Sequence, residues 1–134
     1  FPNSRILGVA AHSEDLPGAA GSIMTVTFEL DGREFTALNG GPMFSFTPAI
    51  SFVIGCIDQA EVDYFWDRLL DGGGQESQCG WLVDRFGVSW QVVPTVLGGL
   101  LGGPDPEGAG RAAQAMMQMR KLDIAALQAA YDGA

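Results

Sequence analysis

The stretch from residue 50 to residue 94 constrains the fold most, because it contains signals for a strand, a helix and a hairpin in that order. Residues 50–57 are a nearly continuous apolar run with β-branched and aromatic side chains, which predicts a strand covered on both faces. Asp58 ends the run and forms an acidic capping box with Glu61. Both carboxylates can accept hydrogen bonds at the positive end of a helix dipole. A helix is therefore expected directly after Asp58.

The predicted helix has one apolar face. Its large apolar side chains recur at i, i+3, i+4, i+7 and i+8, which is the spacing of a single helical face: Val62, Phe65, Trp66, Leu69 and Leu70. The charged side chains on the opposite face are expected to meet water: Asp63, Asp67 and Arg68. Three consecutive glycines at 72–74 then end the helix, because Gly adopts the left-handed C-terminal conformation at little steric cost.

A hairpin is predicted beyond these glycines. Two apolar segments, 79–83 and 88–93, flank a four-residue turn, and a proline closes the second strand. Side chains alternate between the faces of a strand, so Ser89 and Gln91 share one face and Trp90 lies on the other. If Gln91 faces a cavity, Trp90 is expected to pack beneath the helix.

The N-terminal third predicts three antiparallel strands. Ser4–Ala11 and Ile23–Leu30 are rich in apolar and β-branched residues, and a loop at 12–22 separates them. Asp31-Gly32 is a strong hairpin signal that leads to a third strand at 33–39. The second half shows a strand and helix before its hairpin strands, which indicates a weak internal repeat. The repeat predicts that a leading strand and helix are missing, and that residue 1 is not the natural start.

The segment after residue 94 predicts helices. Leucines interrupted by glycine pairs at 96–103 predict a short or frayed turn. Asp105-Pro106 is an N-cap followed by Pro at the first helical position, and 112–121 predicts a helix whose three Met residues fill a core or a dimer contact. Asp123 caps a last helix, which carries three side chains at i, i+3 and i+7: Ile124, Leu127 and Tyr131.

The composition excludes several classes of function. A chain of 134 residues with 47% hydrophobic and 17% charged residues predicts one compact domain, 1–134. The formal net charge of −9, without a Lys/Arg cluster, disfavours nucleic acid and anionic membranes as partners. No apolar run is long enough to span a bilayer. Cys56 and Cys79 do not make a disulfide framework, so two reduced thiols in a cytoplasmic protein are expected.

A combination of short motifs extends along essentially the whole chain, at 38–42, 50–52, 79–81, 84–91, 115–117 and 121–124. Together they resemble the PhnB-like, 3-demethylubiquinone-9 3-methyltransferase branch of the glyoxalase (vicinal oxygen chelate) superfamily. The resemblance implies an α+β fold of paired βαβββ modules whose sheets curl around a cavity, usually in a homodimer. It divides the chain into an incomplete first module at 1–41, a second module at 50–94 and a C-terminal helical segment at 95–134.

The same resemblance bears on metals and cofactors. Metal-using relatives place His or Glu on the inner faces of the sheet; Ser51 stands near the usual His position, and Gln91 where the closing strand usually supplies Glu. A hydroxyl and a neutral amide are poor ligands for zinc or nickel, so no bound metal is expected. Methyl transfer lacks a signal as well, since no Gly-x-Gly-x-x-Gly follows a strand and opens a helix. No cofactor is predicted.

Two further side chains have ordinary structural interpretations. His12 is the only histidine and adjoins a Pro/Gly-containing loop, so an exposed side chain is expected rather than a ligand or a base. Cys79 precedes a glycine at a strand start, without the helix N-terminus or cationic neighbour that activates a thiol. A structural cysteine is the favoured interpretation.

The favoured function is the binding of a small, partly apolar metabolite by a homodimer, without an assigned reaction. The candidate pocket consists of neutral polar and aromatic side chains: Asn39, Ser51, Trp81, Ser89 and Gln91. The alternative is an enzyme, either a lyase or isomerase of the vicinal-oxygen-chelate type or, by family label alone, a methyltransferase. Two or more convergent carboxylate or imidazole groups would favour the enzyme, and a neutral cavity would favour binding.

Overall fold

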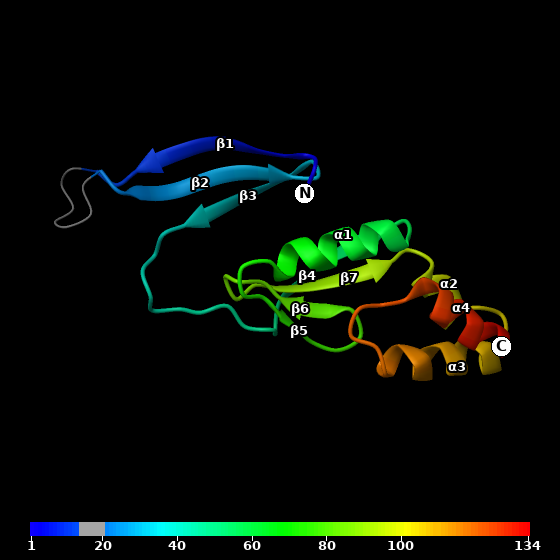
Figure 1. Cartoon of the computed structure of the whole chain (residues 1–134). Helices are drawn as coiled ribbons and strands as arrows, with labels where there is room; N and C mark the ends of the chain where they lie inside the picture. Colours follow the sequence, from blue (N-terminus) through cyan, green and yellow to red (C-terminus); the bar gives the residue numbers. More distant parts are fainter. Residues whose placement is uncertain (14–20) are drawn as a thin grey trace. The chain divides into compact units, whose positions relative to one another are not determined.

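The computed structural model describes residues 1–13 and 21–134. The chain has a mixed α+β fold, and it divides into two compact units, Phe1–Ser45 and Phe46–Ala134. Figure 1 shows a sheet in each unit, with the helices labelled along the chain. Most of the loop predicted at 12–22 lies outside the described residues. None of the helices in the described ranges combines the length and apolarity needed to cross a membrane.

The first unit contains the three antiparallel strands that the sequence predicts. Strands β1 (Ser4–Ala11), β2 (Ile23–Leu30) and β3 (Arg33–Leu38) form a sheet in the order β1-β2-β3. The turn between β2 and β3 has positive φ at both Asp31 (49°) and Gly32 (79°). Positive φ at both central residues is the requirement of the tight hairpin turn that the Asp-Gly pair indicates.

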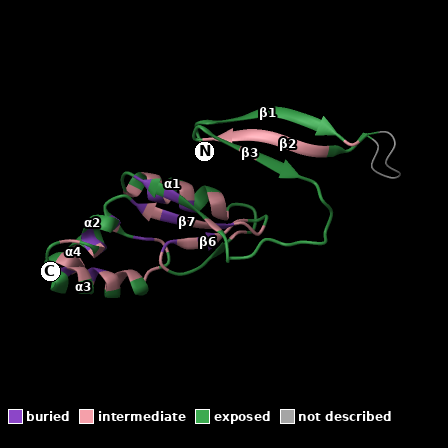
Figure 2. Ribbon diagram, turned by 180° about the vertical axis from the view of Figure 1, so that it is seen from behind, coloured by how far each residue is buried: buried purple, intermediate pink, exposed green. Residues whose placement is uncertain are grey.

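This first sheet has no buried core among its described residues (Figure 2). Apolar side chains on its strands remain open to solvent, such as Ile6 and Leu38, each 69% exposed. Phe28 and Phe35 are half-buried against each other, with ring centroids 5.6 Å apart. In the part of this unit that the structure describes, the sheet is held by strand pairing and one aromatic stack rather than by a buried core.

The second unit begins with the βαβββ module that the sequence predicts. It contains β4 (Ser51–Cys56), α1 (Gln59–Leu70), β5 (Gln75–Glu76), β6 (Trp81–Val83) and β7 (Ser89–Pro94). The sheet order is β4-β7-β6-β5, with β4 parallel to β7 and the other neighbours antiparallel. The first and last strands of the module, β4 and β7, therefore lie side by side, and α1 connects β4 to β5 at the opposite edge of the sheet.

The start of α1 confirms the predicted capping box. Asp58 Oδ1 accepts a hydrogen bond from the backbone N–H of Glu61 at 2.9 Å. Glu61 Oε2 in turn accepts from the backbone N–H of Ile57 at 2.8 Å. In the usual capping box this carboxylate accepts from the backbone N–H of the N-cap residue, here Asp58. In this helix it accepts from the residue before the N-cap. Both carboxylates satisfy backbone donors at the helix start, as the sequence indicates.

Helix α1 covers one face of the four-stranded sheet. Val62 and Trp66 are buried from the helix side, and the sheet contributes buried side chains from three strands: Ile54, Cys56, Leu82, Val92 and Pro94. Trp90 lies on this helix-covered face by strand alternation, as predicted. The other predicted members of the helix stripe are half-buried: Phe65, Leu69 and Leu70. The core of the module is therefore a single layer between helix and sheet.

One expectation about exposure in this module is wrong. Strand β4 is not covered on both faces, since Val53 is 63% and Phe52 42% exposed. The reason is that β4 lies at the edge of its sheet and α1 covers one face only. Asp63 meets water as expected, since 46% of its side chain is exposed, and its Oδ1 also lies 2.9 Å from Lys121 Nζ and accepts from Gln59 Nε2 at 3.0 Å. A lysine from the C-terminal segment therefore pairs with the polar side of α1.

The turn between β6 and β7 is organised by one carboxylate. Asp84 Oδ1 accepts from the backbone N–H groups of Phe86 and Val88, both at 2.9 Å. Asp84 Oδ2 accepts from Trp90 Nε1, also at 2.9 Å. Gly87 completes the turn with a φ of 90°, a conformation that favours glycine. The predicted hairpin is confirmed, and Asp84 joins its turn to an aromatic side chain of the following strand.

The C-terminal segment forms α2 (Leu97–Leu101), α3 (Pro106–Met117) and α4 (Ile124–Asp132). The segment 96–103, predicted as a short or frayed turn, contains the five-residue helix α2. The helix predicted at 112–121 is misplaced, because α3 starts directly after the Asp105 cap and ends at Met117. Beyond its end, the carbonyls of Met119 and Arg120 accept from the backbone N–H groups of residues 79 and 80 at 2.8 and 2.7 Å. Pairing with the sheet segment therefore replaces the last helical turn.

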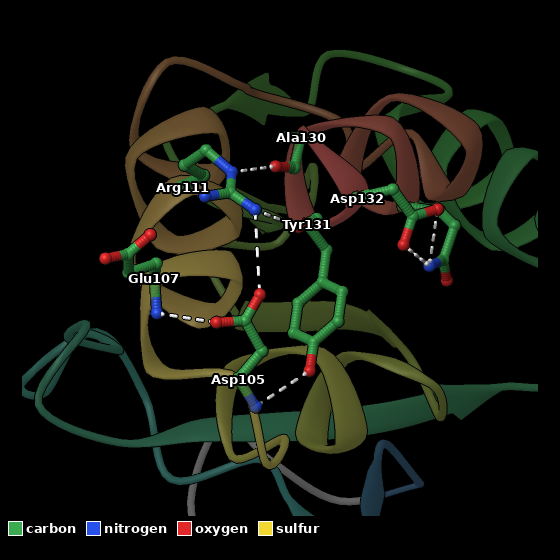
Figure 3. Close-up of polar contacts among 7 residues, drawn as sticks. Asp105, Glu107, Arg111, Ala130, Tyr131 and Asp132 are labelled. Carbon is green, nitrogen blue, oxygen red and sulfur yellow. Dashed lines mark hydrogen bonds and ion pairs between the residues drawn. The ribbon is translucent and has the colours of Figure 1, made fainter. Parts of the chain in front are cut away.

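An arginine joins the C-terminal helices (Figure 3). Arg111 Nε donates to the carbonyl of Ala130 at 2.9 Å, and Arg111 Nη2 to that of Tyr131 at 2.6 Å. These carbonyls belong to the last turn of α4, where the regular i+4 donors are missing, and the Ala130 carbonyl also accepts from the cap N–H of Gly133 at 3.3 Å. Around this contact, the helices enclose a second core: Leu97, Leu100, Ala112, Leu122 and Leu127. Of the methionines, Met116 and Met119 pack against this core, whereas Met117 is 63% exposed.

Candidate functional site

Four of the five predicted site residues lie on one face of the sheet in the second unit. Ser51 on β4 pairs with Ser89 on β7, and Trp81 on β6 pairs with Gln91 on β7. Paired residues point to the same side of a sheet, and residues two apart on a strand do so as well. The four side chains therefore share the face opposite α1. The fifth, Asn39, belongs to the first unit.

Three polar groups gather around one rung of this face. Gln91 Nε2 donates to Ser51 Oγ at 3.0 Å, so the amide reaches back along the strand toward the rung of Ser51 and Ser89. Ser89 is only 2% exposed, and its Oγ is buried without a hydrogen-bond partner. Nearly all buried polar groups in proteins have a partner. The Ser89 hydroxyl is therefore an unused donor and acceptor beside an existing hydrogen bond.

The remainder of this face is uncharged. Strand alternation and pairing place only apolar or neutral residues beside the four candidates: Val53, Gly55, Gln75, Val83 and Val93. Val93 packs against the C-terminal core, so one end of the face is covered. Val53, on the rung of Gln91, is 63% exposed. The face is thus accessible along β4 and closed at the end of β7.

Asn39 has a local structural role in the first unit. Its Nδ2 donates to the backbone carbonyl of Ile23 at 2.9 Å, and its backbone N–H donates to the carbonyl of Met24 at 2.8 Å. These bonds close the open end of the β2–β3 hairpin. Its inclusion in the candidate pocket stays a prediction.

The described residues contain no group of three or more His, Cys, Asp or Glu side chains placed to hold a metal ion. The chemistry of Ser51 and Gln91 agrees with this, since the two groups bind each other and neither is a preferred zinc or nickel ligand. The expected exposure of His12 is wrong: the side chain is half-buried, and its Nδ1 is buried without a partner among the described residues. Its backbone N–H donates to the carbonyl of Ser22, which places it at the end of the β1–β2 ladder.

The two cysteines are free and differ in environment. Burial, together with smaller contributions from the nearby carboxylates of Glu61 and Asp58, raises the pKa of the Cys56 thiol to about 11. Cys56 is thus an inert thiol under the helix. Cys79 is half-buried and has a left-handed φ of 57°, and its N–H donates to the carbonyl of Met119 at the junction between the sheet and the C-terminal helices. Both are structural cysteines in this arrangement.

Sequence reasoning missed two members of the face, Gln75 and Val53. Gln75 lies on β5, whose two residues are too few to show alternation, and only its pairing with Val83 assigns it to this face. Val53 falls inside an apolar run that gave no indication of which side chains meet solvent. Counting alternate residues outward from Ser51 would have found Val53.

Comparisons with known proteins agree with this architecture. The sequence model of the 3-demethylubiquinone-9 3-methyltransferase family matches residues 1–93. The chain belongs to this family. No curated protein matches it. Among solved structures, a PhnB protein from Bacillus cereus is 31% identical, with 71% of this chain and 82% of that chain covered, and has a TM-score of 0.62. A protein from Pseudomonas aeruginosa is 22% identical over 60% of this chain and 71% of its own, with a TM-score of 0.47.

The family assignment agrees with the PhnB-like, glyoxalase-like fold that the sequence motifs indicate. The matched range includes both sheets and ends at Val93, one residue before the end of β7. The four candidate side chains of the uncharged face lie inside it: Ser51, Trp81, Ser89 and Gln91. The C-terminal helices that cover the end of this face lie beyond the matched range.

Proposed function

We propose that this PhnB-like protein binds a small, partly apolar molecule on the uncharged face of its four-stranded sheet, without a bound metal. The buried, unpartnered hydroxyl of Ser89 is the observation that carries this proposal. A buried hydroxyl without a partner costs about 1–3 kcal/mol, which a ligand group bonded to it would recover. The neighbouring pair of Ser51 and Gln91 supplies further donors and acceptors to orient that ligand.

The test is a thermal-shift screen of metabolites and divalent metals, since a ligand that binds only the folded state raises Tm. We expect an organic compound to raise Tm for the wild type, and the shift to fall strongly in Ser89→Ala and Gln91→Ala. The matched controls are Ser77→Ala and Gln114→Ala, which alter exposed side chains of the same types in the same unit. A shift of equal size in all four variants would place binding elsewhere and refute the proposal.

The alternative of an enzyme rests on the family description, which names a methyltransferase. The neutral character of the sheet face favours binding over acid–base chemistry, because it presents no carboxylate or imidazole group. A reaction would therefore have to come from a bound co-reactant. Turnover of any ligand found in the screen, lost in Gln91→Ala, would favour the enzyme.

We further propose a cytoplasmic homodimer. The free thiols support a reducing compartment. Exposed apolar side chains on the first sheet support association, because large open apolar surfaces mark interfaces. Sedimentation at micromolar concentration should give twice the chain mass of 14.1 kDa. A sedimenting monomer would refute the dimer and leave the binding proposal intact.

A further inference from the structure

The charge of the candidate face differs from the charge of the chain that carries it. The chain has a formal net charge of −9, with 16 acidic and 7 basic residues. None of the residues that strand pairing assigns to the face opposite α1 is charged. The nearest acidic residue along the hairpin, Asp84, has both carboxylate oxygens occupied by Phe86, Val88 and Trp90. The face is therefore neutral inside an acidic protein.

The chemistry of this face favours a particular ligand group. Ser51 Oγ accepts from Gln91, so its own O–H is available to donate, and the Ser89 hydroxyl can donate or accept. These groups complement a carbonyl or a hydroxyl. Trp81, on the rung of Gln91 and half-buried, offers a flat apolar surface on which a ring can stack. An ionised group would lose water here and find no counter-charge.

We propose that this face selects uncharged ring compounds that carry a carbonyl or hydroxyl group, and rejects both anionic and cationic analogues. The inference rests on the proposed binding function and adds the class of ligand. Rejection of cations is its distinguishing feature. The net charge of −9 alone would attract cations and repel anions, whereas the local chemistry disfavours both.

The test uses three probes that share one ring and differ in charge: p-hydroxybenzamide, p-hydroxybenzoate and p-hydroxybenzamidine. Titrations are followed by NMR through the Trp81 indole N–H and the backbone amides of β7. We expect the neutral amide to bind roughly tenfold or more tighter than either charged probe. The preference should persist at high ionic strength, which screens the long-range field of the protein but not the desolvation of a bound charge.

A designed charge provides the matched variants. Val53 lies on the rung of Gln91 and is 63% exposed, so Val53→Lys can place an ammonium group beside the site without filling the core. This variant should shift the preference toward p-hydroxybenzoate by about tenfold. Ile57→Lys adds the same charge at a residue 70% exposed and outside the strand, and should leave the preference unchanged.

The outcomes separate the two proposals. If a charged probe binds the wild type with the same affinity as the neutral amide in these titrations, the selectivity is overturned and the binding site stands. Equal responses of Val53→Lys and Ile57→Lys also overturn it, because the effect would then come from net charge. If none of the three probes perturbs these signals at millimolar concentration, the binding proposal fails together with the inference.

Discussion

The two sheets of this chain differ in what covers them. In the first unit, three antiparallel strands leave every described residue at least partly exposed. In the second, a four-stranded sheet with shorter strands has α1 on one face, and it buries residues from β4, β6 and β7. Backbone pairing is thus not sufficient for a core, which requires a second layer.

The difference separates two sources of order. Pairing in the first sheet follows from local chemistry, a tight Asp31-Gly32 turn between two β-rich segments. Burial in the second follows from α1, whose apolar stripe covers the sheet. The free energy of unfolding should therefore depend on side chains in the second unit far more than on side chains in the first. The predictions below test this contrast, beginning with the largest effect.

Trp66→Ala should have the largest effect. The side chain is 2% exposed and its Nε1 donates to Glu76, so its removal leaves a large cavity and breaks that hydrogen bond. We expect a loss of roughly 3–5 kcal/mol in the free energy of unfolding, measured by urea denaturation. Phe65→Ala should cost less, because Phe65 is only half-buried.

The matched change in the first unit is Phe35→Ala, which removes an aromatic ring stacked on Phe28 but not buried. We expect a loss of only about 1 kcal/mol, the worth of an aromatic pair without a core. If Trp66→Ala and Phe35→Ala shift the urea midpoint equally, the first sheet is covered as thoroughly as the second, and the contrast is wrong.

The second prediction compares the two hairpin turns. Asp84→Ala removes the acceptor of three hydrogen bonds and leaves Trp90 Nε1 without this partner. We expect a loss of about 2–3 kcal/mol, the sum of several bonds of modest net strength. Gly32→Ala strains one residue with φ of 79° and open space around it, and should cost about 1 kcal/mol.

Asp84→Asn provides the control for this pair. It keeps one acceptor oxygen and the size of the side chain, so it should restore a large part of the loss. Should Gly32→Ala prove more damaging than Asp84→Ala in thermal denaturation, the turn of the first unit would be the more important of the two. The claim that the second unit holds most of the stability would then fail.

The sequence predicted elements whose signals are local. The bounds of β1 and β2, the Asp58 cap and the two hairpins follow from neighbouring residues, and the structure confirms them. Coverage is a long-range property, and here prediction was wrong: the apolar run of β4 indicated two covered faces, yet Val53 is exposed at a sheet edge. The predicted end of α3 was wrong for the same reason, because the carbonyls of residues 119 and 120 accept hydrogen bonds from residues 79 and 80 where a further helical turn was expected.

The candidate site shows the same division. Alternation along β7 placed Ser89 and Gln91 on one face, and the structure confirms it by pairing them with Ser51 and Trp81. The Ser51–Gln91 hydrogen bond joins residues 40 positions apart, and no spacing rule predicts it. The burial of Ser89 depends on neighbours from other elements and was equally invisible. Sequence therefore identified the face, and the structure identified its unpaired hydroxyl.

The smallest expected effect concerns two ion pairs, one in each unit. Lys121 lies 2.9 Å from Asp63 in the second unit, and Arg5 lies 3.3 Å from Glu29 in the first. Each pair has at least one partner that is more than 40% exposed, so Lys121→Met and Arg5→Met should each cost less than about 1 kcal/mol. The hydrogen bond from Lys121, followed by that from Gln59, lowers the pKa of Asp63. The pair therefore gives the stability of the second unit a defined pH dependence.

The sign follows from the lowered pKa. Asp63 contributes its stability above the ordinary carboxyl pKa near 4, and loses the contribution as pH falls through its lower folded value. The hydrogen bond to Asp63 raises the pKa of Lys121. The stability that Lys121 contributes is therefore complete below the ordinary pKa of lysine and is lost at strongly alkaline pH. The difference in unfolding free energy between wild type and Lys121→Met should be constant between about pH 5 and 9 and shrink below about pH 4. A difference that grows on acidification would contradict the pairing, because protonation of Asp63 can only weaken it.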